Sequence, residues 1–296
     1  MKKGKFSVNL DDVKKKLEEE KNKQSYNDDR FWKLKMNFQK SPKSSAIIRF
    51  LPSKEGELYK KIYRHSFDYI DEFGDKKYVI GVCPTTFGNE CLICKEAVKK
   101  FNSKYESDKE EAKVIRKKTR YISNILVIKD PANPENEGKI FLFEYGRKIF
   151  DKIQSAIEGD LELGEEPINV FSPYDDGANF YLVAKMKDGY VNYDDSKFKE
   201  VKAVFDDIDK VDKLIEEQTY VLDEVVTPEW VECLREEVIE KYVEFVSGKK
   251  LNKDKEEIKT EDLEDEINEL ENENENIDND VDEDDILDDV DDLLDD

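Results

Sequence analysis

Short blocks of apolar residues run through the first two thirds of the chain, at lengths typical of β-strands. One block covers residues 46–51, where Arg49 is the single interruption and Pro52 ends the run. Turn-forming residues separate the blocks, such as Phe73-Gly74-Asp75 and the stretch 130–138. We therefore expect strands at residues 46–51, 63–70, 78–82, 121–129, 139–145, 168–171 and 180–185.

Helical spacing of apolar positions predicts helices at residues 92–101 and 146–157, and again after Val204. In the last region Thr227 and Pro228 suit a helix start, and Gly248 suits a helix end. The fold class expected from this mixture of elements is α+β. The late helix would place its apolar residues at Trp230, Leu234, Val238, Tyr242 and Phe245, and a short N-terminal helix would use Val8, Leu10, Val13 and Leu17.

Charge divides the chain into parts. The net charge is −24, yet residues 1–204 carry +5 and residues 254–296 carry −22. The acidic block contains no aromatic residue, so it cannot bury enough apolar surface to offset its chain entropy. We expect a basic N-terminal segment (1–24), a folded core (25–250) and a disordered acidic tail (251–296).

Four cysteines without an apolar leader favour a reducing, intracellular compartment, and no apolar run is long enough to span a membrane. We expect a soluble protein that is not secreted. The one histidine, His65, precedes Cys83, Cys91 and Cys94, a donor set that suits one closed, structural Zn²⁺ site. The alternative is a surface histidine with three buried, apolar cysteines. The zinc-deaminase pattern fails, and Cys233 is expected to be a free, packed thiol on the late helix.

A basic cluster, residues 116–121, leads directly into a predicted strand. Single-strand binding needs cations along the phosphates and aromatic rings on which bases stack. The alternatives are a charged strand edge that resists aggregation and aromatic residues that fill the core. The candidate cations are Arg49, Arg116, Lys117, Lys118, Arg120, Arg147 and Lys148, and the candidate rings are Tyr105, Tyr121, Phe143, Tyr145 and Tyr193.

Several longer motifs make the chain resemble the helix-destabilising single-stranded-DNA-binding proteins of T-even-type bacteriophages. They include Ile47-Ile48-Arg49-Phe50-Leu51-Pro52, Arg116-Lys117-Lys118-Thr119-Arg120-Tyr121 and Gly177-Ala178-Asn179-Phe180. Further stretches are residues 124–131, 134–139 and 192–198 and the zinc constellation. The resemblance covers about residues 30–200 and returns in the acidic C-terminus.

The resemblance implies an OB-fold β-barrel core with a zinc-binding subdomain and C-terminal helices. It implies cooperative, sequence-tolerant coating of single-stranded DNA in phage replication, recombination and repair, in the cytoplasm of the infected host. It also implies contacts with further copies of the chain and with replication and recombination proteins such as a polymerase, a helicase loader and a recombination mediator. By motif match His65, Cys83, Cys91 and Cys94 are zinc ligands, and Arg49, Arg116, Lys117, Tyr105, Tyr121, Phe143 and Tyr193 line a DNA cleft.

The acidic tail is expected to compete with DNA for a cationic groove, because its tether fixes a high local concentration. An apolar stripe near its end suits folding onto a partner protein: Ile286, Leu287, Val290, Leu293 and Leu294. Plain solubility is the alternative for such a tail. Two rival functions are an enzyme, such as a nuclease or deaminase, and a zinc-scaffolded interaction adaptor that acts through the tail. The lack of a recognisable acidic catalytic motif counts against the enzyme.

Overall fold

The computed structural model describes residues 28–36, 41–161, 164–187 and 190–247. The predicted N-terminal segment and helix, Gly248 and the acidic tail with Ile286, Leu287, Val290, Leu293 and Leu294 lie outside the described residues.

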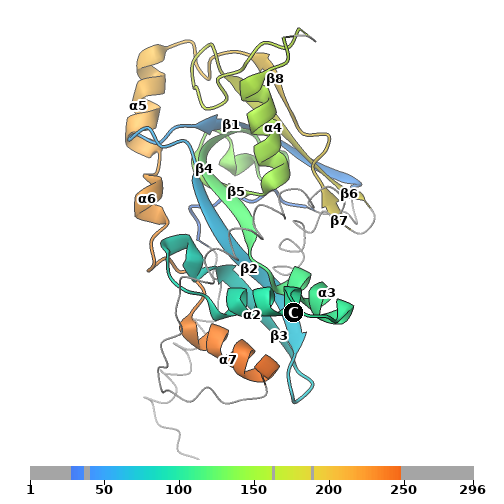
Figure 1. The fold of residues 1–296 in the computed structure, drawn as a ribbon. Helices are drawn as coiled ribbons and strands as arrows, with labels where there is room; N and C mark the ends of the chain where they lie inside the picture. The colour runs from blue at the N-terminus through green and yellow to red at the C-terminus, as the bar shows by residue number, and fades with distance from the viewer. Residues whose placement is uncertain (1–27, 37–40, 162–163, 188–189, 248–296) are drawn as a thin grey trace, which may run out of the picture.

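An antiparallel sheet organises the described part of the chain (Figure 1). Its strands follow the order β3-β2-β4-β1-β6-β7, with β5 added to β4 and β8 added to β6. The strands are β1 (Lys43–Leu51), β2 (Lys60–Ile70), β3 (Lys76–Val82), β4 (Lys118–Lys129), β5 (Ile140–Tyr145), β6 (Ala178–Lys187), β7 (Tyr190–Asn192) and β8 (Lys197–Val201).

The long strand β4 connects the two halves of the sheet. Its first residues, 118–122, pair with β2, and its last, 124–129, pair with β1. Because β5 pairs with residues 121–126, it occupies the other edge of β4. The middle of β4 is buried throughout, which matches its continuous apolar sequence.

An aromatic core lies between β1, β5, β6 and β8. Phe50 is fully buried at its centre, with its ring centroid 5.5 Å from that of Tyr145 and 5.7 Å from that of Phe180. Helix α4 (Arg147–Glu158) covers this core with Ile149, Phe150 and Ile153, the apolar side of an amphipathic helix.

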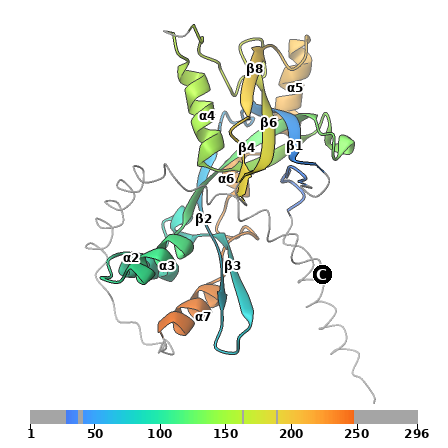
Figure 2. The same cartoon turned by 90° about the vertical axis from the view of Figure 1, so that its right-hand side faces the viewer.

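A second core lies beside β2 and β3, at the other end of the molecule (Figures 1 and 2). Helices α2 (Leu92–Phe101), α3 (Glu106–Ile115) and α7 (Glu236–Ser247) surround it. The ring of Phe67 packs at 4.9 Å against that of Tyr242 from α7. The remaining helical elements are η1 (Pro84–Phe87), η2 (Pro134–Asn136), α5 (Ile208–Gln218) and α6 (Leu222–Val225).

The structure confirms the α+β class, the helix at 92–101, the helix near 146–157 and six of the seven expected strands, although β1, β2, β3, β4 and β6 begin two to three residues earlier than predicted. The strand expected at 168–171 is wrong. Val170 and Phe171 are buried, but the backbone there forms turns, for example from Ser172 N to the carbonyl of Asn169. Helix α3 and strands β7 and β8 were not predicted.

The late helix begins at Glu236, so the predicted start at Thr227 and Pro228 is also wrong. The chain before it runs alongside the end of β3, where Val82 N donates to Glu232 O and Leu234 N donates to Val82 O. Cys233 lies in this bridge and not on a helix. Pairing with a neighbouring strand satisfies these backbone groups in place of helical bonds.

The close packing around Gly177 requires glycine at the first position of the motif Gly177-Ala178-Asn179-Phe180. A Cβ added there would lie 2.0 Å from Ser172 O and 2.4 Å from Arg49 Nη1. We therefore expect Gly177→Ala to destabilise the protein by about 1–3 kcal/mol, the usual range for overpacking a filled interior. Urea unfolding measures this as a lower midpoint with an unchanged slope. An unaltered midpoint would show that the loop accommodates the methyl group without loss of stability.

Candidate metal centre and nucleic-acid interface

Four potential metal ligands from three parts of the second core converge on one point. His65 comes from β2, Cys83 directly follows β3, and Cys91 and Cys94 flank the start of α2. All four residues are buried, and their donor atoms lie within 4.8 Å of one another. The hairpin of β2 and β3 thus supplies two ligands and the first turn of α2 the other two.

The spacing of the donor atoms fits tetrahedral coordination. His65 Nε2 lies 3.5 Å from Cys91 Sγ and 3.4 Å from Cys94 Sγ, and the sulfurs of Cys83 and Cys94 are 3.6 Å apart. Ordinary zinc bond lengths in a tetrahedron place two sulfurs about 3.8 Å apart and a sulfur and a nitrogen about 3.6 Å apart. The residues therefore fit a closed metal centre with four protein ligands.

The surroundings orient the ligands. His65 Nδ1 donates to the carbonyl of Ile115 at 2.8 Å, which turns Nε2 toward the cysteines. Cys83 Sγ lies 3.2 Å from Thr85 Oγ1, and Cys83 N donates to Tyr63 O. These contacts thus fix the orientation of His65 on β2 and of Cys83 after β3.

The pKa values of the ligands reflect their crowding. Hydrogen bonds from Cys91 and Cys94 hold the pKa of Cys83 far below its ordinary value, and hydrogen bonds with Cys83 and Cys91 raise the pKa of Cys94. Burial opposes a charge on His65, but hydrogen bonds to Cys83 and Cys91 outweigh it and raise the pKa of His65 to about 9. A bound divalent cation would stabilise these crowded donors, since thiolates and a neutral imidazole are ordinary zinc ligands.

The predicted DNA residues separate onto two sides of the sheet, because side chains alternate along β4. Tyr121 lies opposite Lys61 of β2 and Tyr145 of β5, while Arg120 lies opposite Ile62 and points to the other side. The basic cluster therefore does not act as one surface.

One side combines the exposed ring of Tyr59 and the half-buried ring of Tyr63 with cations. We call Tyr59, Lys61, Tyr63, Lys117 and Tyr121 the β2–β4 face. The Nζ atoms of Lys117 and Lys61 lie 4.0 and 5.2 Å from the centroid of the Tyr63 ring. Tyr59 is 42% exposed and packs edge-on, at 5.7 Å, against Tyr121.

The ring of Tyr121 in turn stacks on Phe150 of α4, with centroids 3.8 Å apart and planes 1° from parallel. Arg147, at the start of the same helix, is exposed and close enough to influence the pKa of Tyr121, which burial raises. Helix α4 thus supports the β2–β4 face and places Arg147, which pairs with Asp151 at 2.8 Å, beside it.

Five of the predicted DNA residues are buried. Tyr121, at 4% exposed, supports the rings of the β2–β4 face from below, and we leave the other four out of the interface. Arg49 is fully buried; it donates from Nε to Asn179 Oδ1 at 3.1 Å and from Nη1 to Ser172 O at 3.2 Å, and burial lowers its pKa to about 10. Arg120 is buried near Glu144, Phe143 lies in the aromatic core, and Tyr145 Oη bonds Ser123 Oγ at 2.9 Å. Contact with DNA would require these satisfied groups to leave the core.

The other predicted residues reach the surface to different degrees. Tyr105 is 71% exposed at the start of α3. Arg116, Lys117 and Lys118 are half-buried where α3 passes into β4, and Lys148 is half-buried on α4. Tyr193 is half-buried against the aromatic core.

Sequence reasoning missed Tyr59, Lys61 and Tyr63. Their alternate spacing is a strand pattern with one polar, aromatic side, which predicts a shared face. The predicted strand begins at residue 63, three positions after the observed start of β2 at Lys60, and therefore excludes Tyr59 and Lys61.

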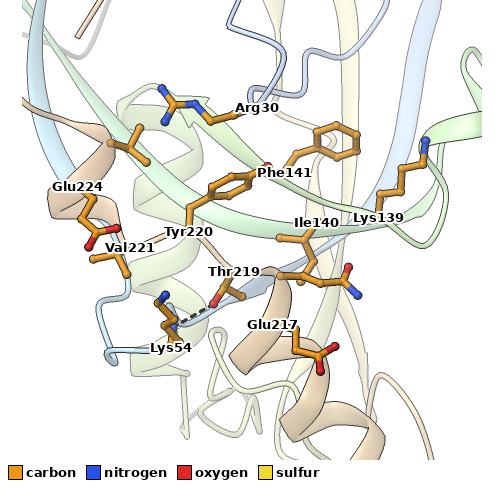
Figure 3. Close-up of a pocket in the computed structure, with 12 residues that line it drawn as sticks. Arg30, Lys54, Lys139, Ile140, Phe141, Glu217, Thr219, Tyr220, Val221 and Glu224 are labelled. Atoms are coloured by element: carbon orange, nitrogen blue, oxygen red, sulfur yellow. Dashed lines mark hydrogen bonds between the residues drawn. The ribbon is translucent and has the colours of Figure 1, made fainter. Parts of the chain in front are cut away.

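A separate pocket of about 760 Å³ lies between β5 and the α5–α6 connection (Figure 3). Arg30, Lys54 and Lys139 line it together with Glu217 and Glu224. None of the residues predicted to bind metal or DNA lines this pocket.

A family model described as "gp32 DNA binding protein like" matches residues 42–246, more than two thirds of the chain. The chain belongs to this gp32-like family. The match covers every described strand together with the metal cluster and the β2–β4 face. The sequence-based assignment to the family of phage single-stranded-DNA-binding proteins is therefore confirmed.

Two relatives carry the name single-stranded DNA-binding protein. The one from Enterobacteria phage T4 is 41% identical over 177 residues, covering 58% of this chain and 56% of the relative. The one from Enterobacteria phage T2 is also 41% identical over 177 residues, with 55% of the relative covered. The alignment thus spans little more than half the length of each. Both names describe binding, not a reaction, as expected for a non-enzymatic family. Among the described helices, none is long and apolar enough to cross a membrane.

Proposed function

We propose that this gp32-like protein binds single-stranded DNA through the β2–β4 face, without chemical turnover. The observation that carries the proposal is the exposed Tyr59 ring on the same face as Tyr63, whose ring the cations Lys61 and Lys117 approach. The family that matches the chain is described as DNA-binding. Cations attract the phosphates, and bases of any sequence stack on a ring. Arg116, Arg147, Lys148 and Tyr105 would extend this path at its ends.

A salt titration tests the proposal. The full chain is mixed with a labelled oligothymidylate and with a duplex of the same length at increasing salt concentrations. We expect preference for the single strand and a linear fall of log affinity with log salt, because phosphate binding releases counterions. Equal affinity for both DNA forms at every salt concentration would refute the proposal and leave an interaction adaptor as the better reading.

We further propose that the ion of the Cys83 cluster is zinc and that its role is structural. Three thiolates and one imidazole leave no position for a substrate or water. The ion would join the β2–β3 hairpin to α2, directly beside Tyr63 and Lys117. The four ligand residues would then hold the β2–β4 face in place, and the metal would only link these residues to one another.

Several finer expectations belong to the same proposal. We infer an OB-fold core, cooperative coating through residues 1–24, partner binding through residues 251–296, and work in phage replication, recombination and repair inside the infected host. The support is the family match and the charge distribution along the chain. The proposed partners remain a polymerase, a helicase loader and a recombination mediator.

The acidic tail gives a prediction of its own. Deleting the residues after Lys253 removes a net charge of −22 and should tighten binding to single-stranded DNA at low salt. The gain should shrink as salt screens the tail. Fluorescence anisotropy at two salt concentrations measures both effects. Equal affinity of the deleted and full chains at low salt would remove competition by the tail from the proposal.

A further inference from the structure

The tip of the β2–β3 hairpin presents the most exposed large apolar side chain among the described residues. Phe73 is 81% exposed in the turn between the two strands. Asp71 fixes this turn, because its Oδ1 accepts hydrogen bonds at 2.9 Å from the backbone N of Phe73 and of Asp75. Gly74 allows the reversal with a φ of 84°. An ordered turn therefore carries an aromatic ring that projects into solvent.

The tip is acidic around this ring. Asp71 and Asp75 both pair with Lys77, at 3.4 and 3.2 Å. Glu72 is exposed and forms no salt bridge with another described residue. A surface that binds this tip would need an apolar hollow for the ring and a cation for Glu72.

The pocket between β5 and the α5–α6 connection has the apolar hollow (Figure 3). Ile140 and Val221 are buried in its lining, and the rings of Phe141 and Tyr220 are half-buried there. Its volume of about 760 Å³ leaves room for an aromatic side chain together with its neighbours. We call it the β5 pocket.

Two exposed lysines give the β5 pocket its cations. Lys54 and Lys139 line it, and neither forms a salt bridge with another described residue. Arg30 also lines it but already pairs with Asp28 at 2.6 Å. Lys139 directly precedes Ile140 and Phe141, so an acidic side chain beside an inserted ring would meet its ammonium group.

The two complementary surfaces lie far apart on one copy of the chain. The hairpin projects from the end of the molecule that carries β3 and α7, whereas α5 and α6 lie toward the other end (Figures 1 and 2). Contact between them therefore requires two copies. Because the two surfaces differ, each pair leaves one of each kind free, and the contact can extend into a row of copies.

We propose that the Phe73 hairpin of one copy inserts into the β5 pocket of the next, with the ring against Phe141 and Tyr220 and Glu72 facing Lys139. The proposal rests on the proposed coating of DNA by several copies. It adds a contact between folded surfaces to the one expected from residues 1–24.

A nucleotide fits the β5 pocket less well than this hairpin. The two rings suit stacking on a base, but Glu217 and Glu224 also line the pocket and would repel a phosphate. The hairpin tolerates these carboxylates, because Lys76 and Lys77 directly follow its acidic tip.

Photo-cross-linking of the full chain tests the proposal. A benzophenone amino acid replaces Phe73, and this probe chain is mixed with an isotopically heavy chain, with and without a long oligothymidylate. Mass spectrometry identifies the links between copies. We expect them at residues 139–141 and 218–225 of the heavy chain, at higher yield on DNA, because one strand concentrates neighbouring copies. Links to other surfaces, or links no more frequent than from the same probe at exposed Tyr190, would overturn the proposal.

A charge swap between the two copies tests the orientation. Glu72→Lys in the probe chain, or Lys139→Glu in the heavy chain, should each lower the cross-link yield at least about threefold, because like charges then face each other. Both changes together should restore most of the yield. The matched control combines Glu72→Lys in the probe chain with Lys43→Glu in the heavy chain and should restore nothing. Equal yields from these two combinations would overturn the proposal.

Failure of the proposed function would appear separately. An oligothymidylate too short for two copies measures binding at the β2–β4 face, and Phe73→Ala should leave that affinity unchanged. If Lys139→Glu weakens this binding more than Lys43→Glu does, the β5 pocket takes nucleic acid and the proposal fails. The cross-links in the DNA-free sample do not depend on DNA binding.

Discussion

Replacing Cys91 with serine should remove the metal ion and markedly lower the melting temperature. Cys91 is buried, its sulfur lies 3.5 Å from His65 Nε2, and it is one of the four residues of the cluster among the described residues. We expect a loss on the order of 3–5 kcal/mol, as for one partner removed from a buried charged cluster. In a domain of this size that corresponds to roughly 10 °C in melting temperature. Elemental analysis and thermal unfolding measure the two effects.

Cys233→Ser is the matched control. Its thiol is half-buried, donates to the carbonyl of Thr227 and lies outside the metal cluster. This variant should keep its full metal content and lose little stability. Full metal content in Cys91→Ser with an unchanged melting temperature would refute a structural metal at this site.

Replacing Tyr59 with alanine should produce the largest loss of DNA affinity for a single exposed side chain. Tyr59 is 42% exposed, but its buried side packs against Tyr121 and Phe150, so thermal unfolding of the variant is measured alongside. Loss of one stacking platform costs about 1–3 kcal/mol, or roughly a 5- to 150-fold weaker affinity. The measurement is anisotropy with a short labelled oligothymidylate, chosen so that cooperativity does not contribute.

Two further variants isolate the ring. Tyr59→Phe keeps the ring and should bind nearly as well as the unaltered chain. Tyr190→Ala removes a tyrosine of matched exposure, 43%, from β7, away from the β2–β4 face, and should leave affinity unchanged. If all three variants bind alike, Tyr59 does not stack on a base.

Much of the fold was predictable where the local pattern was strong. Helix α2 was located at its observed bounds, because its apolar positions and the preceding Cys91 mark a clear start. Residues 168–171 were not, since an apolar sequence can also anchor a loop through buried Val170 and Phe171. The late helix is shorter than predicted because residues 232–234 pair with β3. This tertiary contact leaves no signal in the local sequence.

The same distinction holds for the site. The metal cluster followed from residue types and short spacings, and the structure brings all four ligands together. The DNA residues were harder to assign, because a sequence shows which side chains are aromatic or basic but not which side of a sheet they occupy. Arg49 resembles a phosphate ligand in sequence, yet its guanidinium bonds Asn179 and Ser172 inside the protein. Tyr59, by contrast, can be recognised as part of the β2–β4 face only when β2 is known to begin at Lys60.

The second core contains three cysteines together with Leu234, Ile239 and Tyr242 from the region of α7. Chelation should therefore loosen α7 as well as the ligand loops. The acidic segment that we propose to compete with DNA follows α7 in the sequence, so a loosened α7 should lower the local concentration of that segment at the β2–β4 face. Oxidation of the cysteines or loss of the metal would in this way weaken the competition that we propose between the tail and DNA.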